Sequence, residues 1–424
     1  MAFQRSSGVL LHPTSLPRGT VGPDAYRFVD WLAAAGQTWW QLLPLSPPDE
    51  YGSPYASSSA FAGSASLLAD PEAHVSAREL RSFRARQRYW IEDWALFAGE
   101  GAIADQLRFE REWMALRRFA RSRGIHILGD LALYVGDGSC DALARPELFE
   151  PDFVAGAPPD YHSTTGQLWN NPCYDWRVHR AEGYRWWIER LRRLLELVDA
   201  VRIDHFRGLV AYWAIPRGAP TAELGCWRPG PGLRFFNAVE AELGRLPLVA
   251  EDLGVITPAV RRLLAEIDAP GMRILQYEFD HMRGWSAFAN HPERCALYTG
   301  THDNEPLAAW WSNTSEVVRA RVERELAGRR ISGDDPVWAL VELVFVARAR
   351  VAFVQVQDLL GLGSEARMNK PGTPNGNWRW RLEPDQLDEE LAARLRRLTE
   401  ASGRLRGARA DSSAPRTRRA SARR

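Results

Sequence analysis

The sequence has one lysine, few cysteines, almost no net charge and no long apolar run. Lys370 is the only lysine among 54 basic residues, so nearly all positive charge is arginine. A formal net charge of +1 argues against nucleic acid or an anionic membrane as the main partner. No stretch approaches the ~20 apolar residues of a membrane span. The first apolar run is also too short for a signal peptide. We therefore expect a soluble, cytoplasmic protein.

Motifs for metals, disulfides and nucleotides are also missing. The four cysteines are scattered without a C-x-x-C pair, which fits reduced thiols better than a disulfide or zinc framework. The stretch 361–366 nominally fits the dinucleotide fingerprint, but no βαβ unit follows it. There is no H-E-x-x-H, Walker or EF-hand motif. We predict that the protein needs no cofactor and no metal.

Tryptophan, by contrast, is plentiful. The chain has 18, and several lie within a few residues of Gly, Pro, Asn or Asp: Trp169, Trp213, Trp227, Trp310 and Trp378. A flat aromatic face on a loop suits the apolar face of a sugar ring, although burial in a core is the commoner use of a single tryptophan. Taken together, these residues favour a carbohydrate-binding protein.

Eight strand-like runs alternate with helical stretches along the chain. The helical stretches include 24–35 and 181–198, which carry apolar residues at helical spacing. The strand-like runs are 7–12, 38–44, 124–133, 198–208, 246–253, 272–279, 295–303 and 352–360. Eight repeats of strand and helix predict an α/β fold of the (β/α)₈ barrel type. A doubly wound open sheet is the alternative.

The barrel is predicted to occupy residues 1–403 with two additions. Residues 45–123 are too long for a simple connection and are interpreted as an inserted subdomain. Residues 155–172 lack periodicity and are rich in turn formers, so we predict a long surface loop that covers the active site. Residues 404–424 are rich in arginine and almost free of apolar residues, which predicts a disordered tail. An inert extension is the favoured interpretation, and a site for an acidic partner is the alternative.

Acidic residues follow three of the predicted strands. Asp204, Glu251 and Asp303 stand where the apolar pattern stops, and strand C-termini line the active site of a barrel. Arg202 shares a strand face with Asp204, and a neighbouring cation favours an ionised carboxylate. A single acid at a strand end is more often a helix cap or a member of an ion pair. Three on one rim indicate glycoside hydrolysis or transfer, which uses converging carboxylates.

Several long strings carry a family resemblance, which runs from about residue 6 to 403. They are HPTSLP, YGSPYASSSAFAG, GAPPDYHSTTGQLW, VRIDHFRG, AEDLG, YTGTHDN and GSEARMN-x-PG-x-x-x-GNWRWR. The sequence resembles the 4-α-glucanotransferases called amylomaltases or disproportionating enzymes. Relatives often carry one more residue, acidic or amide, between the Gly and Ser of YGSPY, so the loop around Tyr55 is tighter in this chain.

The resemblance implies a retaining α-glucanotransferase on an α-amylase-like barrel that needs no cofactor. Asp204 is then the nucleophile, Glu251 the general acid/base and Asp303 the carboxylate that stabilises the transition state. The matching residues that hold the donor glucose are Tyr55, Asp130, Arg202 and His302. Those in the loop that covers the acceptor side are Tyr161, Gln167 and Trp169.

Two other functions are compatible with parts of this pattern. One is an α-amylase-type hydrolase, in which water is the acceptor. The other is a catalytically dead barrel that binds glycogen or starch, although an intact acid/base pair argues against it. For the transferase, the expected partners are α-1,4-glucans and maltooligosaccharides, with glucose as an acceptor. We expect a monomer or a weak homo-oligomer.

Overall fold

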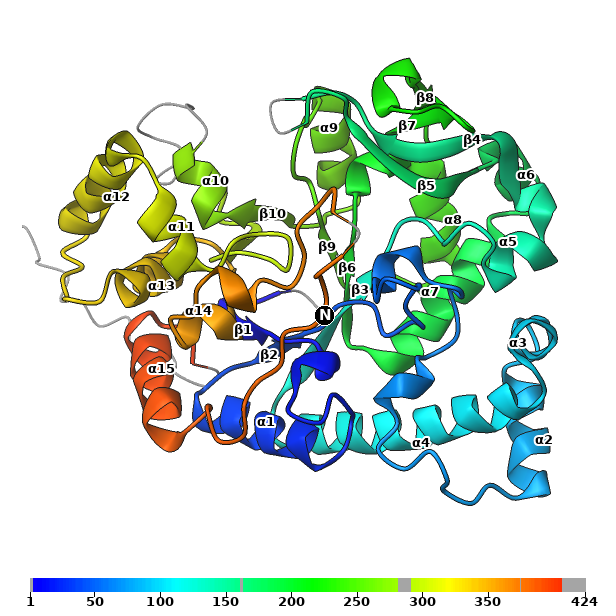
Figure 1. Cartoon of the computed structure of the whole chain (residues 1–424), viewed down its shortest axis with the longest axis horizontal. Helices are drawn as coiled ribbons and strands as arrows, with labels where there is room; N and C mark the ends of the chain where they lie inside the picture. The colour runs from blue at the N-terminus through cyan, green and yellow to red at the C-terminus, as the bar shows by residue number, and fades with distance from the viewer. Residues whose placement is uncertain (1–2, 161–162, 281–290, 374, 406–424) are drawn as a thin grey trace, which may run out of the picture.

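A closed barrel of eight parallel strands forms the centre of the molecule (Figure 1). The computed structural model describes residues 3–160, 163–280, 291–373 and 375–405. In spatial order the barrel strands are β1 (Ser6–Leu10), β12 (Val351–Gln355), β11 (Cys295–Tyr298), β10 (Gly271–Ile274), β9 (Leu248–Ala250), β6 (Ala200–Ile203), β3 (His126–Leu131) and β2 (Trp39–Gln41). All eight predicted strands are present, so the prediction of a (β/α)₈ barrel is confirmed.

The inside of the barrel is packed with large side chains. Residues two apart in a strand share a face, so one set of alternate residues points inward. Trp39 fills the space beside β1, where a Cβ on Gly8 would lie 2.5 Å from the Trp39 Cβ atom. The inner cluster also includes Phe3, Leu128, Ala200, Val249, Met272, Ile274, Ala296, Tyr298, Val351 and Phe353. The barrel is therefore a packed core, and chemistry is restricted to its rims.

Helices surround the barrel and bury a second, larger apolar layer against it. They are α1 (Pro23–Ala34), α4 (Gly101–Ser122), α7 (Arg185–Leu197), α8 (Leu233–Leu243), α9 (Pro258–Glu266), α10 (Leu275–Asp280), α11 (Leu307–Asn313), α12 (Glu316–Gly328), α13 (Pro336–Val346), α14 (Val356–Leu359) and α15 (Glu389–Ala401). Shorter helices α5 (Cys140–Ala144) and α6 (Trp176–Ala181) lie between β3 and α7. In the part of the chain that the structure describes, no helix combines the length and apolarity needed to cross a bilayer.

The predicted insertion at 45–123 is smaller than expected. Its first helices, α2 (Ala77–Arg86) and α3 (Ile91–Ala98), project beside the barrel (Figure 1). The third, α4, is the barrel's own crossover helix between β2 and β3, and it packs on α1, β3 and α7. The sequence prediction placed α4 in the insertion because a helix before the next strand has the same periodicity in either position.

The prediction of a long surface loop at 155–172 is wrong for most of its length. Ala155 belongs to β4 (Phe149–Ala157), and Gln167 begins β5 (Gln167–Tyr174). With β7 (Ala211–Pro216) and β8 (Cys226–Pro229) they form an antiparallel sheet in the order β5-β4-β7-β8. Register shifts between β4 and β5 accommodate the prolines and glycine that suggested a loop. Between these two strands the structure describes 158–160 and 163–166, which are not in strands, and Tyr161 lies outside the described residues.

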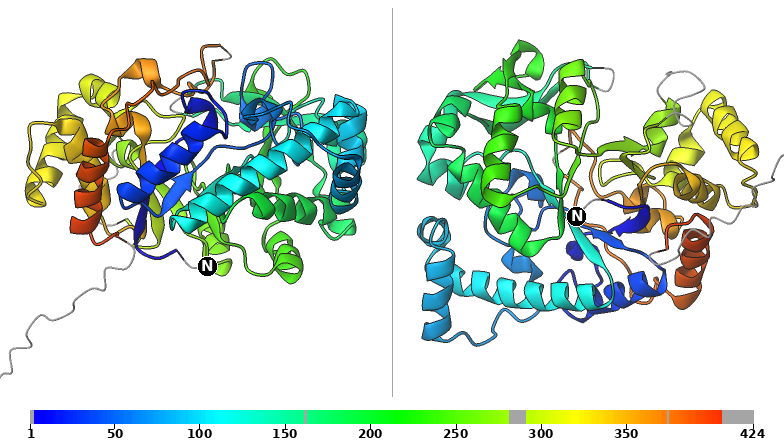
Figure 2. Two further views of the ribbon diagram at one scale, coloured as in Figure 1. Left: turned by 90° about the horizontal axis from the view of Figure 1, so that it is seen from below. Right: turned by 180° about the vertical axis from the view of Figure 1, so that it is seen from behind.

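The predicted boundary of the tail also needs correction, because Arg404 is completely buried. Its guanidinium donates five hydrogen bonds of 2.7–3.1 Å to the backbone carbonyls of Ser6, Phe345, Ala347, Ala349 and Arg350. The helix before it, α15, lies beside α1 (Figure 2). Arg404 thus joins the C-terminal helix to the barrel strands β1 and β12. An arginine-rich composition concealed this role because sequence alone does not distinguish a buried arginine from a solvated one.

Two truncations distinguish the contribution of Arg404 to stability from that of the residues after it. A chain that ends at Leu405 should keep its melting temperature and activity, since residues 406–424 offer almost nothing apolar to bury. A chain that ends at Gly403 loses the five hydrogen bonds of Arg404, and although Arg5 still donates to the Phe345, Ala347 and Ala349 carbonyls, we expect a loss of about 3 kcal/mol. Thermal unfolding of both chains and of Arg404→Met checks this, and equal melting temperatures for all three would contradict it.

Candidate active site

Strand pairing places the predicted catalytic residues side by side. Asp130 on β3 is the register partner of Arg202 on β6, so their side chains leave the barrel on the same side. Ile203 is likewise paired with Ala250, and the next residues along these strands are Asp204 and Glu251. The Glu251 N–H donates to the Ile203 carbonyl at 2.9 Å, which extends this pairing to the rim. The two carboxylates therefore stand next to each other at the C-terminal end of the barrel.

Arg202 lies between two carboxylates. One terminal nitrogen donates to both oxygens of Asp130 at 2.7 Å, and the other is 3.0 Å from Oδ1 of Asp204. The Arg202 and Asp130 side chains are buried, whereas that of Asp204 is 27% exposed. Burial lowers the pKa of Arg202, but the charges of Asp130 and Asp204 outweigh it and raise that pKa well above its usual value. Arg202 thus keeps its positive charge beside Asp204.

Glu251 is in an environment that favours its protonated form. Burial and the neighbouring Asp204 charge raise the pKa of Glu251 to about 8. One oxygen accepts a hydrogen bond from the His205 N–H at 2.7 Å, and the other accepts one from the Leu253 N–H at 2.9 Å. His205 can offer its N–H in this direction because its backbone is left-handed, with φ of 43°. The two amides fix the position of the carboxyl group and lower its pKa, but burial and the Asp204 charge outweigh them.

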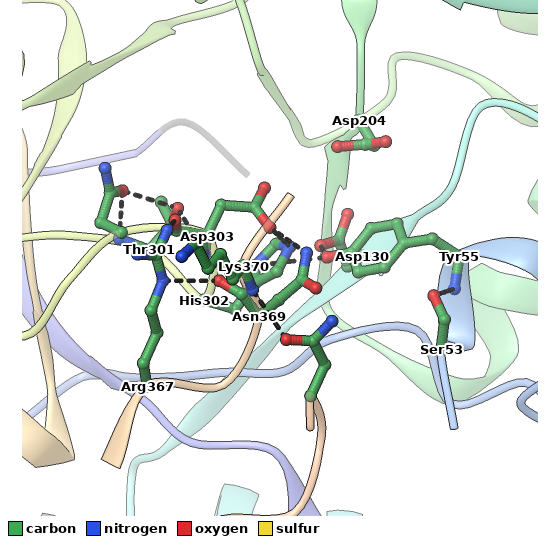
Figure 3. A network of polar contacts seen from close by, with 12 residues as sticks. Ser53, Tyr55, Asp130, Asp204, Thr301, His302, Asp303, Arg367, Asn369 and Lys370 are labelled. Carbon is green, nitrogen blue, oxygen red and sulfur yellow. Dashed lines mark hydrogen bonds and ion pairs between the residues drawn. The ribbon is translucent and has the colours of Figure 1, made fainter. Parts of the chain in front are cut away.

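Tyr55 and His302 form one wall of the site (Figure 3). Their rings are stacked with centroids 4.9 Å apart, and the Tyr55 hydroxyl donates to Asp130 at 2.7 Å. Burial raises the pKa of Tyr55 well above its usual value, so the phenol keeps its proton. All three side chains belong to different segments of the chain: the loop after β2, β3 and the loop after β11. The tighter YGSPY loop still brings Tyr55 into this cluster.

Asp303 is held by residues near the C-terminal end of the chain, on the side of the site opposite Asp130 (Figure 3). The Asn369 side-chain amide donates to Oδ1 of Asp303 at 2.6 Å, and Arg367 donates to the Asp303 backbone carbonyl at 2.5 Å. The His302 ring lies 3.4 Å from the same carboxylate oxygen. Sequence reasoning gave no role to Asn369 or Arg367, although both belong to the string GSEARMN that carried the resemblance.

Trp378 is a second residue whose position sequence reasoning did not predict. Its ring lies 5.9 Å from that of Tyr55 and 5.7 Å from that of His302, measured between centroids. Its backbone is left-handed, with φ of 63°, a costly conformation for a bulky residue. The Trp378 N–H donates to the Met368 carbonyl at 2.6 Å and holds the residue there. The string GNWRWR was the available signal.

On the other side of Asp204, Trp169 and Gln167 come from β5. The Trp169 ring meets the His205 ring edge to face with centroids 4.9 Å apart, directly after the Asp204 position in the chain. Its indole N–H donates to the Gln167 side chain at 3.0 Å. Trp169 is partly buried and also packs near Tyr134. The structure thus brings two of the three predicted acceptor-side residues to the rim, and Tyr161 lies outside the described residues.

Metal ligands are not grouped in this site. Among the described residues, no cluster of three or more His, Cys, Asp or Glu side chains is arranged to hold a metal ion. The carboxylates are paired instead with Arg202, with backbone amides and with Asn369. Two neighbouring carboxyl groups in different environments, next to an aromatic wall, are suited to acid/base and nucleophilic chemistry on a sugar.

A family model described as 4-alpha-glucanotransferase matches residues 10–77 and 102–387. The chain belongs to the 4-alpha-glucanotransferase family. It is 39% identical to the 4-alpha-glucanotransferase of Thermus thermophilus, over 96% of this chain and 100% of that relative. The relative from Synechocystis is 38% identical, over 95% of this chain and 99% of its own. The family predicted from the sequence is confirmed.

Solved structures agree with this membership. The amylomaltase from Streptococcus agalactiae in complex with acarbose is 31% identical, with a TM-score of 0.87 over 95% of this chain and 100% of that one. An α-amylase from Geobacillus thermoleovorans has a TM-score of 0.52 at 12% identity, which shows a shared fold alone. The predicted enzyme class, a 4-α-glucanotransferase on an amylase-like barrel, is therefore confirmed.

Proposed function

We propose that the protein transfers a segment of an α-1,4-glucan to another glucan or to glucose through a covalent glycosyl-Asp204 intermediate. The observation that carries this proposal is the contrast between the two neighbouring carboxyl groups. Asp204 stands beside the charged Arg202, whereas the pKa of Glu251 is raised to about 8. A retaining enzyme needs one carboxylate that attacks and one carboxylic acid that protonates the leaving oxygen.

The reaction then proceeds in two displacements. Asp204 attacks the anomeric carbon of the donor, and Glu251 gives its proton to the glycosidic oxygen, which leaves as a free hydroxyl. In the second step, the now ionised Glu251 takes the proton of an acceptor hydroxyl, and that oxygen attacks the same carbon and releases Asp204. Two inversions retain the α configuration. Asp303 stabilises the positive charge that develops on the sugar ring in the transition state of each step.

The donor glucose is proposed to lie against Tyr55 and His302. Their stacked rings offer an apolar wall, and Asp130 and Arg202 beneath them offer hydrogen-bond partners for sugar hydroxyls. Because Tyr55, Asp130 and Arg202 are joined by hydrogen bonds of 2.7 Å, the pocket is preorganised before a donor binds. Preorganised polar groups lose little entropy when the transition state forms.

A transferase must also favour a sugar acceptor over water. We propose that Trp169 and Gln167, with Tyr161 from the adjoining loop, bind the acceptor sugar beside Asp204. Trp169 offers an aromatic face and touches His205, whose N–H holds Glu251. A sugar seated there displaces water and brings its hydroxyl to the acid/base. Donors and acceptors are proposed to be maltooligosaccharides and longer α-1,4-glucans of the cytoplasm, used by a monomer or weak homo-oligomer.

Incubation with maltotriose alone tests this function. A transferase should produce glucose and a ladder of longer maltooligosaccharides while the number of reducing ends stays constant. Thin-layer chromatography or mass spectrometry resolves the ladder, and a reducing-sugar assay counts the ends. A steady rise in reducing ends would support the α-amylase-type hydrolase instead. A lack of any product would support a glucan-binding barrel without activity.

Replacing Trp169 with alanine tests the acceptor side. If Trp169 binds the acceptor, Trp169→Ala should raise hydrolysis relative to transfer severalfold while the fold stays intact. If Trp169 only pins β5 onto the barrel, the melting temperature and both activities should fall together, and the ratio should not change. Product ratios from maltotriose and a thermal unfolding curve distinguish the two. The same comparison applies to Tyr161→Ala.

A further inference from the structure

We propose that the outer face of the antiparallel sheet carries a second contact site for long α-glucans, centred on Trp227 and Trp213. It rests on the proposed function only for the substrate class, since an α-1,4-glucan is the ligand in both. The site would hold the part of a long glucan that extends beyond the catalytic cleft. Maltotriose is too short to occupy the cleft and this face together.

Trp227 and Trp213 form a rigid, accessible aromatic corner. They are register partners on β8 and β7, and their rings meet at 67° with centroids 5.2 Å apart. Trp227 is 39% exposed, which makes it the most accessible tryptophan of the described residues. The Trp213 indole donates to the Ala222 carbonyl at 2.9 Å, and a Cβ on Gly225 would lie 2.2 Å from that indole nitrogen. Both rings are thus held in place, and because Arg207 lies over one face of Trp227 and Trp213 is partly buried, the accessible part of this corner is the rest of the Trp227 ring.

This corner has the shape and chemistry of a sugar platform. The face of an indole packs against the apolar face of a glucose ring, and its rim leaves the hydroxyls free to form hydrogen bonds. Two rings inclined to one another follow the bend of an α-1,4-linked chain better than two coplanar rings. Exposed Leu224 widens the apolar surface, and Glu223 beside it provides carboxylate acceptors for hydroxyl groups.

Arg207 connects the corner to the catalytic rim. Its guanidinium lies 3.7 Å from the centre of the Trp227 ring and donates to the Val255 carbonyl at 2.6 Å. Arg207 follows Asp204 in the turn after β6, and Val255 follows Glu251 in the loop after β9, where it is 61% exposed. The Arg207 Nε atom is buried and has no hydrogen-bond partner among the described residues.

The other edge strand of this sheet, β5, also contacts the segment after Asp204. Trp169 on β5 contacts His205, while Trp227 on β8 contacts Arg207, so both edges rest on the segment directly after Asp204. Trp169 itself lies on the face opposite Trp213 and Trp227, because Leu168 is the residue of β5 in register with Gly156 and Trp213. A glucan that leaves the cleft over Arg207 therefore reaches Trp227 on the outer face. The aromatic corner is joined to the catalytic rim, and this connection, more than the exposure of Trp227, indicates that the substrate binds there.

Two variants test the site: Trp227→Ala, and Phe97→Ala as a matched control that removes an exposed aromatic ring from α3. Trp227→Ala should raise the KM for amylose roughly five- to tenfold and leave kcat and KM for maltotriose within about twofold. Trp227→Phe should restore most of the loss. Phe97→Ala should change neither substrate. In an Asp204→Asn background, Trp227→Ala should reduce retardation in an amylose-containing native gel, a readout that needs no catalysis.

Three results would overturn the proposal. The first is an unchanged KM for amylose together with unchanged gel retardation. The second is an equal loss with maltotriose and amylose, which would mean that Trp227 merely supports Arg207. The third is an equal effect of Phe97→Ala. Because the gel measures binding by an inactive protein, failure of the proposed transfer reaction leaves this test intact.

Discussion

Asp204→Asn is expected to abolish turnover with every donor, because no other group can form the bond to the anomeric carbon. Glu251→Gln should lose at least ~10²-fold on glucans, whose leaving oxygen needs a proton. The same variant should keep activity on α-glucosyl fluoride, since fluoride leaves without protonation. The measurement is the initial rate of each variant with maltotriose and with the fluoride. Equal responses of the two variants to the fluoride would refute the assignment of roles.

The pH dependence of the unmodified protein provides an independent check. The pKa of Glu251 is raised to about 8, so its acid form predominates below that pH and is lost as the pH rises through it. The rate on glucans should therefore fall above about pH 8, whereas formation of the intermediate from α-glucosyl fluoride should lack this limb. If the rate fell at the same high pH with both donors, the fall would come from the titration of another group.

Arg202→Met should lower activity almost as much as Asp204→Asn does, and it should also destabilise the fold. Arg202 is buried between Asp130 and Asp204, and its loss leaves their charges facing each other without a cation. Burial already raises the pKa of Asp130, and the Arg202 charge opposes that shift. We expect at least ~10³-fold lower kcat on maltotriose, with roughly 3–5 kcal/mol less stability. Steady-state kinetics and denaturant unfolding measure the two effects.

Arg202→Lys is the matched control. It keeps the positive charge but has one nitrogen in place of the two that contact Asp130 and Asp204 separately. It should recover most of the stability but less of the activity, because a single ammonium group cannot hold both carboxylates in place. If Arg202→Met kept wild-type stability and activity, the ion pairs of Arg202 would be irrelevant to the site.

Sequence was sufficient to predict the barrel and its rim acids for a physical reason. Buried parallel strands must be short apolar runs, and Asp204 and Glu251 stand where such runs stop. The residues before them, Ile203 and Ala250, pair with each other because β6 and β9 are neighbours in the barrel. Local pattern and topology are therefore sufficient to predict the positions of residues that directly follow a barrel strand.

Other features depend on contacts that no local pattern encodes. Strands β4 and β5 contain proline, glycine and register shifts, so their sequences read as a loop until the partner strands are in place. Asn369 reaches Asp303 from a segment 66 residues away, and nothing near Asn369 marks it as part of the site. Arg404 is another such case, because its five acceptors are backbone carbonyls, which have no signature in side-chain composition.

The hydrogen bonds of Arg404 join the two ends of the chain, so the barrel closes only late in synthesis. Strand β1 is made first, but one of its two edges pairs with β12, which is among the last strands to leave the ribosome. Until then that edge is open, and open strand edges invite pairing with other chains. Arg404 then donates hydrogen bonds to the Ser6 and Arg350 carbonyls and stabilises the pairing of β1 with β12. We expect nascent chains released before β12 is complete to aggregate, and chains that contain both β12 and Arg404 to close promptly.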